Sequence, residues 1–349
     1  MYLSIVKRIS RRNFIPAIGA LLVTPVLLST SREINEGQTR IRSKALKVGD
    51  VIGLCASAGA SHDLAEVDGF ISIINSHGFL VKEGKNVRKK LGYFSASDEE
   101  RAAEFMAFIL DSNIKAIFFT RGGWGCARIL EFLDFDAIRN NPKIIMGFSD
   151  ICSLLNAITF KSGLTTFHGP NGNASWNEFS WKSIEDLIVK GKTVTYPFPS
   201  LDLVEAKPET IVSGKATGQL FGGNLTVMTG LLGSKYLPDW TGKILFFEDV
   251  LEEPYSIDRM LTQWKLNGVF DKVSGIILCQ FRKCVPEEPE WSFTLNEVFQ
   301  QHFKLLSIPV FSGFSLGHVK NKYSVPIGEE VTMDADQFTL QLKEEAVIH

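Results

Sequence analysis

The sequence lacks most of the features that mark a metalloprotein, a disulfide-linked scaffold or a nucleic-acid-binding protein. Its five cysteines are an odd number without a CxxC pair, so neither a zinc site nor a full disulfide framework is indicated. In an oxidising compartment Cys279 and Cys284 could pair, but small buried apolar thiols are the commoner outcome. The net charge is −2 and the basic residues are scattered. We therefore expect no metal, no other cofactor and no nucleic-acid partner.

The N-terminal segment lacks both acidic residues and an apolar run long enough to span a bilayer. The run from Phe14 to Leu28 has about 15 residues, whereas a spanning helix needs about 20. Arg11 and Arg12 precede it, as in a twin-arginine export signal. Residues 1–30 are therefore predicted to be a signal peptide that places the protein in the periplasm. An ordinary secretion signal or an uncleaved anchor is the alternative, and the protein would otherwise have no contact with a membrane.

What is present is an ordinary globular composition, with 45% hydrophobic and 22% charged residues in 349. Between residues 45 and 170, short apolar runs at 51–55, 116–120 and 143–148 are each followed by a helical pattern. Ser97 and Glu100 have the spacing of a capping box and predict the start of one of these helices. This alternation predicts an α/β domain with a parallel sheet and helices on both faces.

The second half of the sequence has a different pattern. Prolines and polar residues interrupt the periodicity over 171–208, where we place a linker. Residues 209–345 are predicted to form a strand-rich C-terminal domain, with strands at 244–247 and 275–280 among others. No internal repeat is present, which disfavours a duplicated two-lobed binding protein.

Ser149 lies in the segment GFSD, where a predicted buried strand meets a helix. Such a turn can hold a serine hydroxyl exposed, as in a nucleophile elbow, and the helix N-terminus offers backbone amides to an oxyanion. Ile151 replaces the second glycine of the GxSxG pattern, and Ser149-Asp150 before a helix is also typical of a plain N-cap. The segment alone leaves both interpretations open.

A glycine-rich loop, RGGWG at 121–125, follows another predicted strand. Its glycines allow a close backbone approach to a bound group, so the amide of Gly122 or Gly123 can complete an oxyanion hole with the Asp150 amide. A tight turn is the alternative. The order of the glycines does not fit a dinucleotide-binding fingerprint.

Two later strand ends carry further polar side chains. The apolar strand that begins at Ile244 ends in Glu248 and Asp249, where a carboxylate can orient a histidine. A solvated acidic loop is the alternative, and a metal cluster is disfavoured because no histidine is near in sequence. His318 follows a glycine in a turn that can direct its imidazole into a cleft, although lone histidines are usually structural or solvated. His168 is the other histidine in a strand-end turn.

Together these segments resemble the LD-carboxypeptidase family, also called muramoyltetrapeptide carboxypeptidases, which includes the microcin-immunity peptidases. The resemblance implies that Ser149 is the nucleophile, that His318 is the base and that Glu248 orients it. It also implies a flavodoxin-like N-terminal domain and a barrel-like C-terminal domain with the active site between them. The matching segments are RGGWG at 121–125, GFSD at 147–150, HGP at 168–170, GGNL at 222–225, LFFEDV and EEPYSIDRML within 245–261, and GH at 317–318.

The resemblance further implies a murein-derived peptide as substrate. Family members cut the bond between an L-centre of diaminopimelate or lysine and a terminal D-alanine, so a cation must pair with the free carboxylate; Arg121 is our candidate. Asn224 of the GGNL segment and Trp176 are further substrate-binding candidates. A homodimer is also implied. The better-known members are cytoplasmic, and a proline-serine pair is expected where this chain has Ala56-Ser57.

Two other functions remain open from the sequence. The same triad can hydrolyse a peptidyl- or acyl-adenylate toxin, which requires an aromatic side chain that stacks on the nucleotide near the cleft. Alternatively, the protein can be a non-catalytic periplasmic peptide-binding module that retains the cleft. Protection by nucleotides favours the first alternative, and peptide binding without turnover favours the second.

Overall fold

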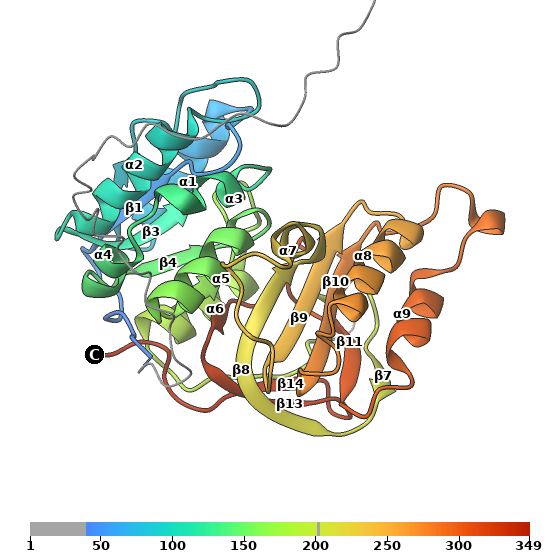
Figure 1. The fold of residues 1–349 in the computed structure, drawn as a ribbon. Coiled ribbons are helices and arrows are strands. Elements are labelled where there is room, and N and C mark those ends of the chain that lie inside the picture. Colours follow the sequence, from blue (N-terminus) through green and yellow to red (C-terminus); the bar gives the residue numbers. More distant parts are fainter. Residues whose placement is uncertain (1–39, 201–202) are drawn as a thin grey trace, which may run out of the picture. The chain divides into compact units, whose positions relative to one another are not determined.

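The computed structural model describes residues 40–200 and 203–349 (Figure 1). The predicted signal peptide, residues 1–30, lies outside the described residues. Among the described residues, none of the helices has both the length and the apolar character that a membrane span requires.

The first half is built on a sheet that, within the described residues, has six strands in the order β12-β5-β4-β3-β1-β2. Strands β1 to β5 are parallel, and β12 pairs antiparallel with β5 at one edge. The predicted parallel sheet is thus confirmed, with one antiparallel strand added. The strands are β1 (Val51–Cys55), β2 (Leu80–Glu83), β3 (Ile114–Phe119), β4 (Ile144–Gly147), β5 (Thr166–His168) and β12 (Val325–Ile327).

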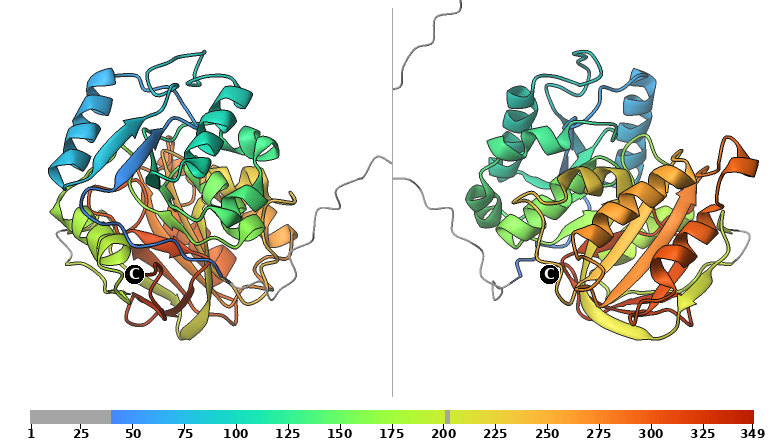
Figure 2. Two further views of the ribbon diagram at one scale, coloured as in Figure 1. Left: turned by 90° about the vertical axis from the view of Figure 1, so that its left-hand side faces the viewer. Right: turned by 45° about the vertical axis from the view of Figure 1, so that its right-hand side comes forward.

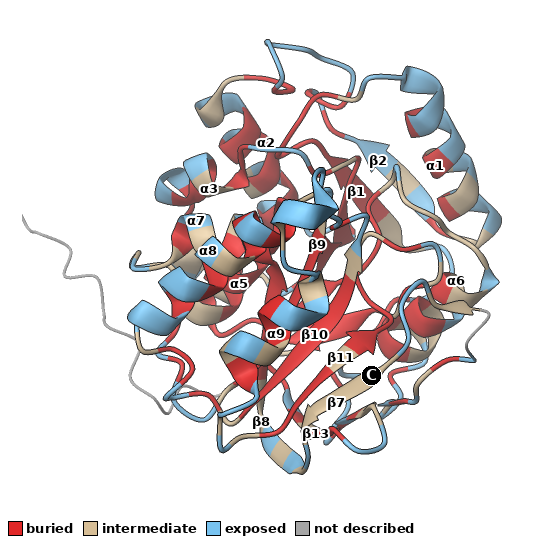
Figure 3. Cartoon of the chain, turned by 90° about the vertical axis from the view of Figure 1, so that its right-hand side faces the viewer, coloured by how far each residue is buried: buried red, intermediate tan, exposed pale blue. Residues whose placement is uncertain are grey.

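Helices cover both faces of this sheet because successive strand residues point to opposite sides. In β3, Ile117 and Phe119 join the apolar core under α2 and α5, whereas Ala116 and Phe118 join the core under α1. Figure 3 shows the buried residues on the strands and on the inner faces of the helices. The helices are α1 (Leu64–Ser76), α2 (Asp98–Leu110), α3 (Cys126–Ile129), α4 (Phe135–Asn140) and α5 (Ile151–Ser162), and a 3₁₀ turn (Leu130–Phe132) follows α3.

The second half contains a sheet of eight strands within the described residues, in the order β6-β14-β13-β8-β9-β10-β11-β7. Strands β8 to β11 are parallel and the outer strands antiparallel. The sheet curls into a half-barrel with α7, α8 and α9 on one face, which confirms the predicted barrel-like architecture (Figure 2). The strands are β6 (Thr195–Tyr196), β7 (Glu209–Val212), β8 (Lys215–Asn224), β9 (Ile244–Val250), β10 (Gly275–Arg282), β11 (Val310–Phe314), β13 (Glu330–Asp334) and β14 (Thr339–Leu342). The helices are α7 (Leu225–Leu231), α8 (Pro254–Leu266) and α9 (Leu295–Phe303), with a 3₁₀ turn (Pro289–Trp291) before α9.

The two halves are more closely joined than the predicted linker implies. The 171–208 segment carries α6 (Glu178–Ile184), a π-helical turn (Glu185–Val189) and β6, which pairs with β14 of the second sheet. In return, β12 comes from the C-terminal half and pairs with β5 of the first sheet. The prolines at 197, 199 and 208 do not interrupt these elements, because all three follow β6 in the sequence.

Helix α5 is also fastened to the second sheet. The Asn156 side chain donates to the Gly222 carbonyl at 2.8 Å and accepts from the Gly222 amide at 3.2 Å. At Gly223, φ is +150° and an added Cβ would lie 2.5 Å from Sγ of Cys152, so only glycine allows this approach. Because α5 follows Ser149 and β8 lies beside β9, this contact fixes the serine relative to Glu248.

Candidate active site

Ser149 stands on a strained turn between β4 and α5. Its φ is +63°, in the left-handed region that residues with a Cβ rarely adopt. The Asn171 side chain holds the turn, because it donates to the Phe148 carbonyl at 3.1 Å and accepts from the Phe148 amide at 3.1 Å. A strained strand-to-helix turn that presents a serine has the geometry of a nucleophile elbow.

The Asp150 side chain does not cap the helix that follows it. It makes no capping hydrogen bond to α5, and its Oδ2 instead accepts a hydrogen bond from the Cys126 amide at 2.8 Å. Burial raises the pKa of this carboxyl to about 6. Asp150 therefore ties the serine turn to the helix that follows the glycine loop, and the plain N-cap interpretation does not account for it.

The glycine loop lies directly against the serine. A Cβ added at Gly122 would lie 2.8 Å from Oγ of Ser149 and 3.2 Å from the Asp150 amide nitrogen. Gly123 has φ of +110°, which also favours glycine. No described residue accepts a hydrogen bond from the Gly122, Gly123 or Asp150 amide. Unpaired backbone amides beside a serine hydroxyl are what an oxyanion hole requires.

Glu248 and His318 are in direct contact although they are 70 positions apart in the sequence. Nδ1 of His318 lies 2.7 Å from Oε2 of Glu248, and the same oxygen accepts from the His318 amide at 3.2 Å. Gly317 makes this possible, because with φ of +104° an added Cβ would lie 2.7 Å from Cβ of Glu248. The turn therefore fixes the imidazole through both its ring and its backbone.

The electrostatics of this pair favour a charged histidine. Burial by itself lowers the pKa of His318, but the charge of Glu248 and its hydrogen bond outweigh this effect and the net shift is upward. Burial by itself raises the pKa of Glu248, and its interactions with His318 reverse that shift. The carboxylate therefore stays ionised and stabilises the imidazolium that forms when His318 takes a proton.

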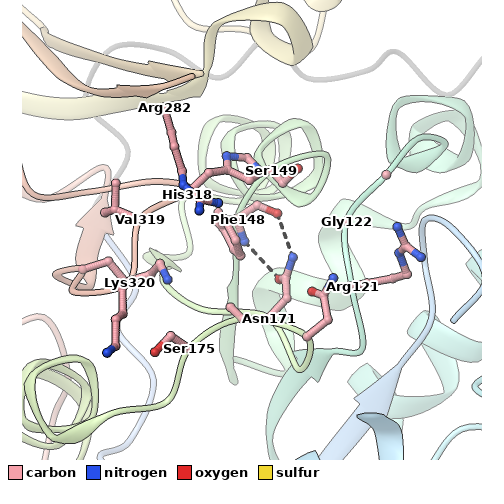
Figure 4. Close-up of a pocket in the computed structure, with 14 residues that line it drawn as sticks. Arg121, Gly122, Phe148, Ser149, Asn171, Ser175, Arg282, His318, Val319 and Lys320 are labelled. Carbon is pink, nitrogen blue, oxygen red and sulfur yellow. Dashed lines mark hydrogen bonds between the residues drawn. The ribbon is translucent and has the colours of Figure 1, made fainter. Parts of the chain in front are cut away.

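Ser149 and His318 line one cavity of about 450 Å³ (Figure 4). All charged side chains that line it are basic, namely Arg121, Arg282, Lys320 and Lys322. No hydrogen bond joins Ser149 to the imidazole in the described part of the chain, an arrangement that substrate binding often tightens. The cavity therefore combines a serine, a histidine and a positive wall.

Asn224 and Trp176 lie outside the lining of this cavity. The Asn224 side chain accepts from the Val227 amide at the start of α7 and donates to Oδ1 of Asp249 at 2.9 Å. The Trp176 ring packs 5.0 Å from the Phe70 ring, and its Nε1 donates to a backbone carbonyl at 2.9 Å. Both side chains thus make contacts that support the walls of the site, and their predicted role in substrate binding stays a prediction.

Sequence reasoning did not single out Asn171 or Arg101. Arg101 is fully buried and donates to the carbonyls of Ser57 and Gly125, so it joins the loop after β1 to the glycine loop. Asn171 directly follows the HGP segment at the end of β5. Its position next to this segment is the sequence feature that could have indicated a role in the site. Ser57, whose role was open, is buried outside the cavity lining.

His168 is not suited to act as the base. Its ring is buried against Phe246, with centroids 5.3 Å apart, and neither ring nitrogen has a hydrogen-bond partner among the described residues. Burial lowers the pKa of His168 to about 4, so the ring stays neutral. Among the described residues, no cluster of three or more His, Cys, Asp or Glu side chains is placed to hold a metal ion. All five cysteines are buried free thiols, so Cys279 and Cys284 do not form a disulfide.

Known protein families match the two halves of the chain separately. The LD-carboxypeptidase N-terminal domain family matches residues 52–169, and the LD-carboxypeptidase C-terminal domain family matches residues 217–333. A probable murein peptide carboxypeptidase of Bacillus subtilis (strain 168) is 37% identical over 303 residues, covering 85% of this chain and 93% of that protein.

Two further similar proteins are an immunity protein and a second carboxypeptidase. The microcin C7 self-immunity protein MccF of Escherichia coli is 33% identical over 330 residues, which covers 86% of this chain and 95% of that protein. The crystal structure of muramoyltetrapeptide carboxypeptidase from Oxalobacter formigenes matches with a TM-score of 0.75 and 26% identity. That match covers 86% of this chain and all of the other, so the similarity extends through both halves.

Proposed function

The chain belongs to the LD-carboxypeptidase family of serine peptidases, and on this basis we propose that it releases a terminal D-alanine from murein tetrapeptides by hydrolysing the L,D-peptide bond. One observation carries the proposal: a serine on a strained turn shares a cavity with a histidine that a buried glutamate orients. The names of the relatives support a carboxypeptidase that acts on murein peptides.

In this mechanism, Ser149, His318 and Glu248 act as a catalytic triad. His318 takes the proton of Oγ through Nε2, and Ser149 attacks the carbonyl carbon of the L-residue. Glu248 keeps the proton of the imidazole on Nδ1 and stabilises the imidazolium. His318 then gives its proton to the nitrogen of the leaving D-alanine, and water hydrolyses the acyl-enzyme by the same steps.

The oxyanion of the tetrahedral intermediate would lie among the backbone amides of the glycine loop and the serine turn. Gly122 leaves room for it, since a side chain there would meet Oγ of Ser149. The amides of Gly123 and Asp150 are the proposed donors, with the positive end of α5 behind them.

The positive wall of the cavity suits a substrate with a free carboxylate. Arg121, the residue that the sequence suggested for this pairing, is one of the basic side chains on the wall. Its Nη1 already donates to the Ala60 carbonyl at 3.2 Å, so it has further donors available but a fixed position.

Release of D-alanine is the direct test. The purified protein is incubated with a tetrapeptide that ends in D-alanine, and free alanine is followed by mass spectrometry for the wild type and Ser149→Ala. Release by the wild type alone supports the reaction and its nucleophile. Release by both proteins contradicts the role of Ser149, and release by neither contradicts the proposed substrate.

The second candidate is hydrolysis of a peptidyl- or acyl-adenylate, which the similarity to MccF favours. Such a substrate needs an exposed aromatic side chain near the cavity. Trp176 is packed away, whereas Trp124 on the glycine loop is 46% exposed and lines an adjoining hollow. If adenosine monophosphate protects the enzyme against inhibition, and this protection is lost in Trp124→Ala, the result would favour this candidate over the murein peptidase.

Export is part of the proposal, because murein peptides that end in D-alanine are accessible in the periplasm. The support is the twin-arginine pattern within residues 1–30. Cell fractionation should recover the full-length protein from the periplasm, and changing both Arg11 and Arg12 to lysine should leave it in the cytoplasm. Periplasmic recovery of that variant indicates an ordinary secretion signal. The homodimer implied by the resemblance also remains a prediction, testable by light scattering.

A further inference from the structure

The basic residues of the cavity lie at two separate ends of it. Arg121 belongs to the glycine loop, on the far side of Ser149 and Asn171 from His318 (Figure 4). Arg282 and Lys320 lie on the His318 side in the same view. Lys322 follows four residues after His318 in the same turn. Ser149 and Asn171 thus separate Arg121 from Arg282 and Lys320 in this view.

The chemistry of the reaction decides which end receives the substrate's carboxylate. In a serine peptidase, the histidine must donate its proton to the leaving nitrogen, so the leaving residue lies against the histidine. In a carboxypeptidase, that residue is the terminal one, and its carboxyl carbon is roughly 2.5 Å from the leaving nitrogen, two covalent bonds away. The pairing cation must therefore stand beside His318, and Arg121 does not.

The Lys322 ammonium is well placed to bind an anion in the cavity. The residue is only 3% exposed, yet it lines the cavity. The Nζ atom lies 5.6 Å from the centre of the Phe148 ring, and the His318 ring packs 4.8 Å from the same ring. Within the described residues, Nζ has neither a hydrogen bond nor an ion pair at contact distance. A buried ammonium without a partner is unfavourable, and a bound carboxylate would remove that penalty.

Arg282 is another cation on this side, but it is already partly engaged by an acidic side chain. It ends β10, its side chain is 43% exposed, and its Nε lies 3.3 Å from a carboxylate oxygen of Glu205. Burial lowers the pKa of Lys322 to about 8, which is consistent with an ammonium that has no direct partner. Lys322 is therefore the principal site and Arg282 the supporting one.

The opposite end of the cavity suits the rest of the peptide. Arg121 and Gly123 also line an adjoining hollow of about 380 Å³, whose wall includes the exposed rings of Tyr93 and Trp124. Aromatic rings of this kind offer a large contact surface to the acyl part of a peptide. The two hollows share residues, so one extended substrate can occupy both.

We propose that Lys322, with Arg282, binds the free carboxylate of the leaving residue, and that the acyl part of the peptide extends past Arg121 toward Tyr93 and Trp124. This inference rests on the proposed carboxypeptidase function. It makes Lys322 the residue that distinguishes a terminal D-amino acid from an internal one, because only the terminal residue carries a carboxylate at this position.

The test compares two substrates that differ only in this charge. One tetrapeptide ends in D-alanine and the other in D-alaninamide, and kcat/KM is measured for each. The wild type should prefer the acid on the order of 100-fold, the effect of one charge-assisted pair in a desolvated site. In Lys322→Met, the preference should fall to near unity, while Arg121→Met should retain it. Lys322→Arg should restore most of the preference.

Two results would overturn the inference: an unchanged acid-to-amide ratio in Lys322→Met, or loss of the ratio in Arg121→Met. Calorimetric binding of both peptides to Ser149→Ala, with and without Lys322→Met, gives a reading that does not need turnover. If the wild type hydrolyses neither peptide, the proposed function fails, and this binding decides the inference alone. Tighter binding of the acid that depends on Lys322 supports it, and equal or absent binding contradicts it.

Discussion

The two sides of the active site are built by different means. On the serine side, the backbone does the positioning: Ser149 has a left-handed φ, and Gly122 lies so close that an added Cβ would meet its hydroxyl. On the histidine side, a buried charge does it, since Glu248 holds both the ring and the backbone of His318.

This difference determines what each side tolerates. A backbone-built site is insensitive to pH but fails when atoms are added, because neighbouring main chain cannot move aside. A charge-built site accepts small changes of shape but fails when the charge is removed, because a buried imidazolium then has no counter-ion.

The histidine side should fail most completely in Glu248→Gln. The substitution keeps the size of the side chain but removes the charge that stabilises the imidazolium, so kcat should fall about 10⁴-fold. Steady-state release of D-alanine measures it. Glu330→Gln, at an exposed position on β13, is the matched control and should retain activity. A loss of less than tenfold in Glu248→Gln would show that the buried charge is not what this side depends on.

The serine side should fail in Gly122→Ala, with kcat lower by about 10³-fold. The added methyl would enter the space beside Oγ of Ser149 and the Asp150 amide, where the oxyanion has to lie. Gly69→Ala is the matched control, since nothing lies within 4 Å of a Cβ there and the residue is in α1. Gly69→Ala should retain activity and be slightly more stable. Equal activity of the two variants would refute the proposed position of the oxyanion.

Asn171→Ala should have a smaller effect on the serine side, with a loss of stability as well as activity. Both polar groups of the Phe148 backbone would lose their buried partner, which corresponds to about 2–3 kcal/mol of unfolding free energy. We expect kcat to fall about 10–100-fold because the serine turn relaxes. Urea unfolding measures the loss of stability, and kcat measures the loss of activity. A stable variant with full activity would show that the serine turn does not depend on Asn171.

The pH dependence should distinguish the two sides most finely. His318 must be neutral to accept a proton, so kcat/KM should rise tenfold per pH unit below the pKa of His318 and level off above it. The carboxylate of Glu248 raises that pKa above the ordinary value of 6.5, so the rise should extend above pH 6.5. In the residual activity of Glu248→Gln, the midpoint should move to lower pH. An unchanged midpoint would mean that another group controls the profile.

The sequence predicted the local features of the fold well. Strand β1 was predicted at 51–55 and observed at Val51–Cys55, and the capping box of Ser97 and Glu100 is present at the start of α2. These features depend on residues within a few positions of one another. The chemical identity of Ser149, Glu248 and His318 as candidates likewise came from local patterns and a family resemblance.

The rest could not be predicted, because it depends on contacts between distant segments. Strand β12 joins the first sheet through the pairing of Val325 with His168, which no local pattern indicates. The packing of Trp176 away from the cavity depends on α1, and the burial of Lys322 depends on the ring of Phe148. Sequence patterns indicate which side chains carry chemistry, whereas the fold determines which of them face the cavity.

The most direct test of the central claim, that the two sides join in one triad, is to trap the acyl-enzyme. The wild type is mixed with a tetrapeptide ending in D-alanine and quenched with acid during turnover, and its peptides are mapped by mass spectrometry. We expect a tripeptide acyl group on Ser149, which accumulates far more slowly in Glu248→Gln. Turnover without any acyl group on Ser149, or an acyl group on another residue, would contradict it.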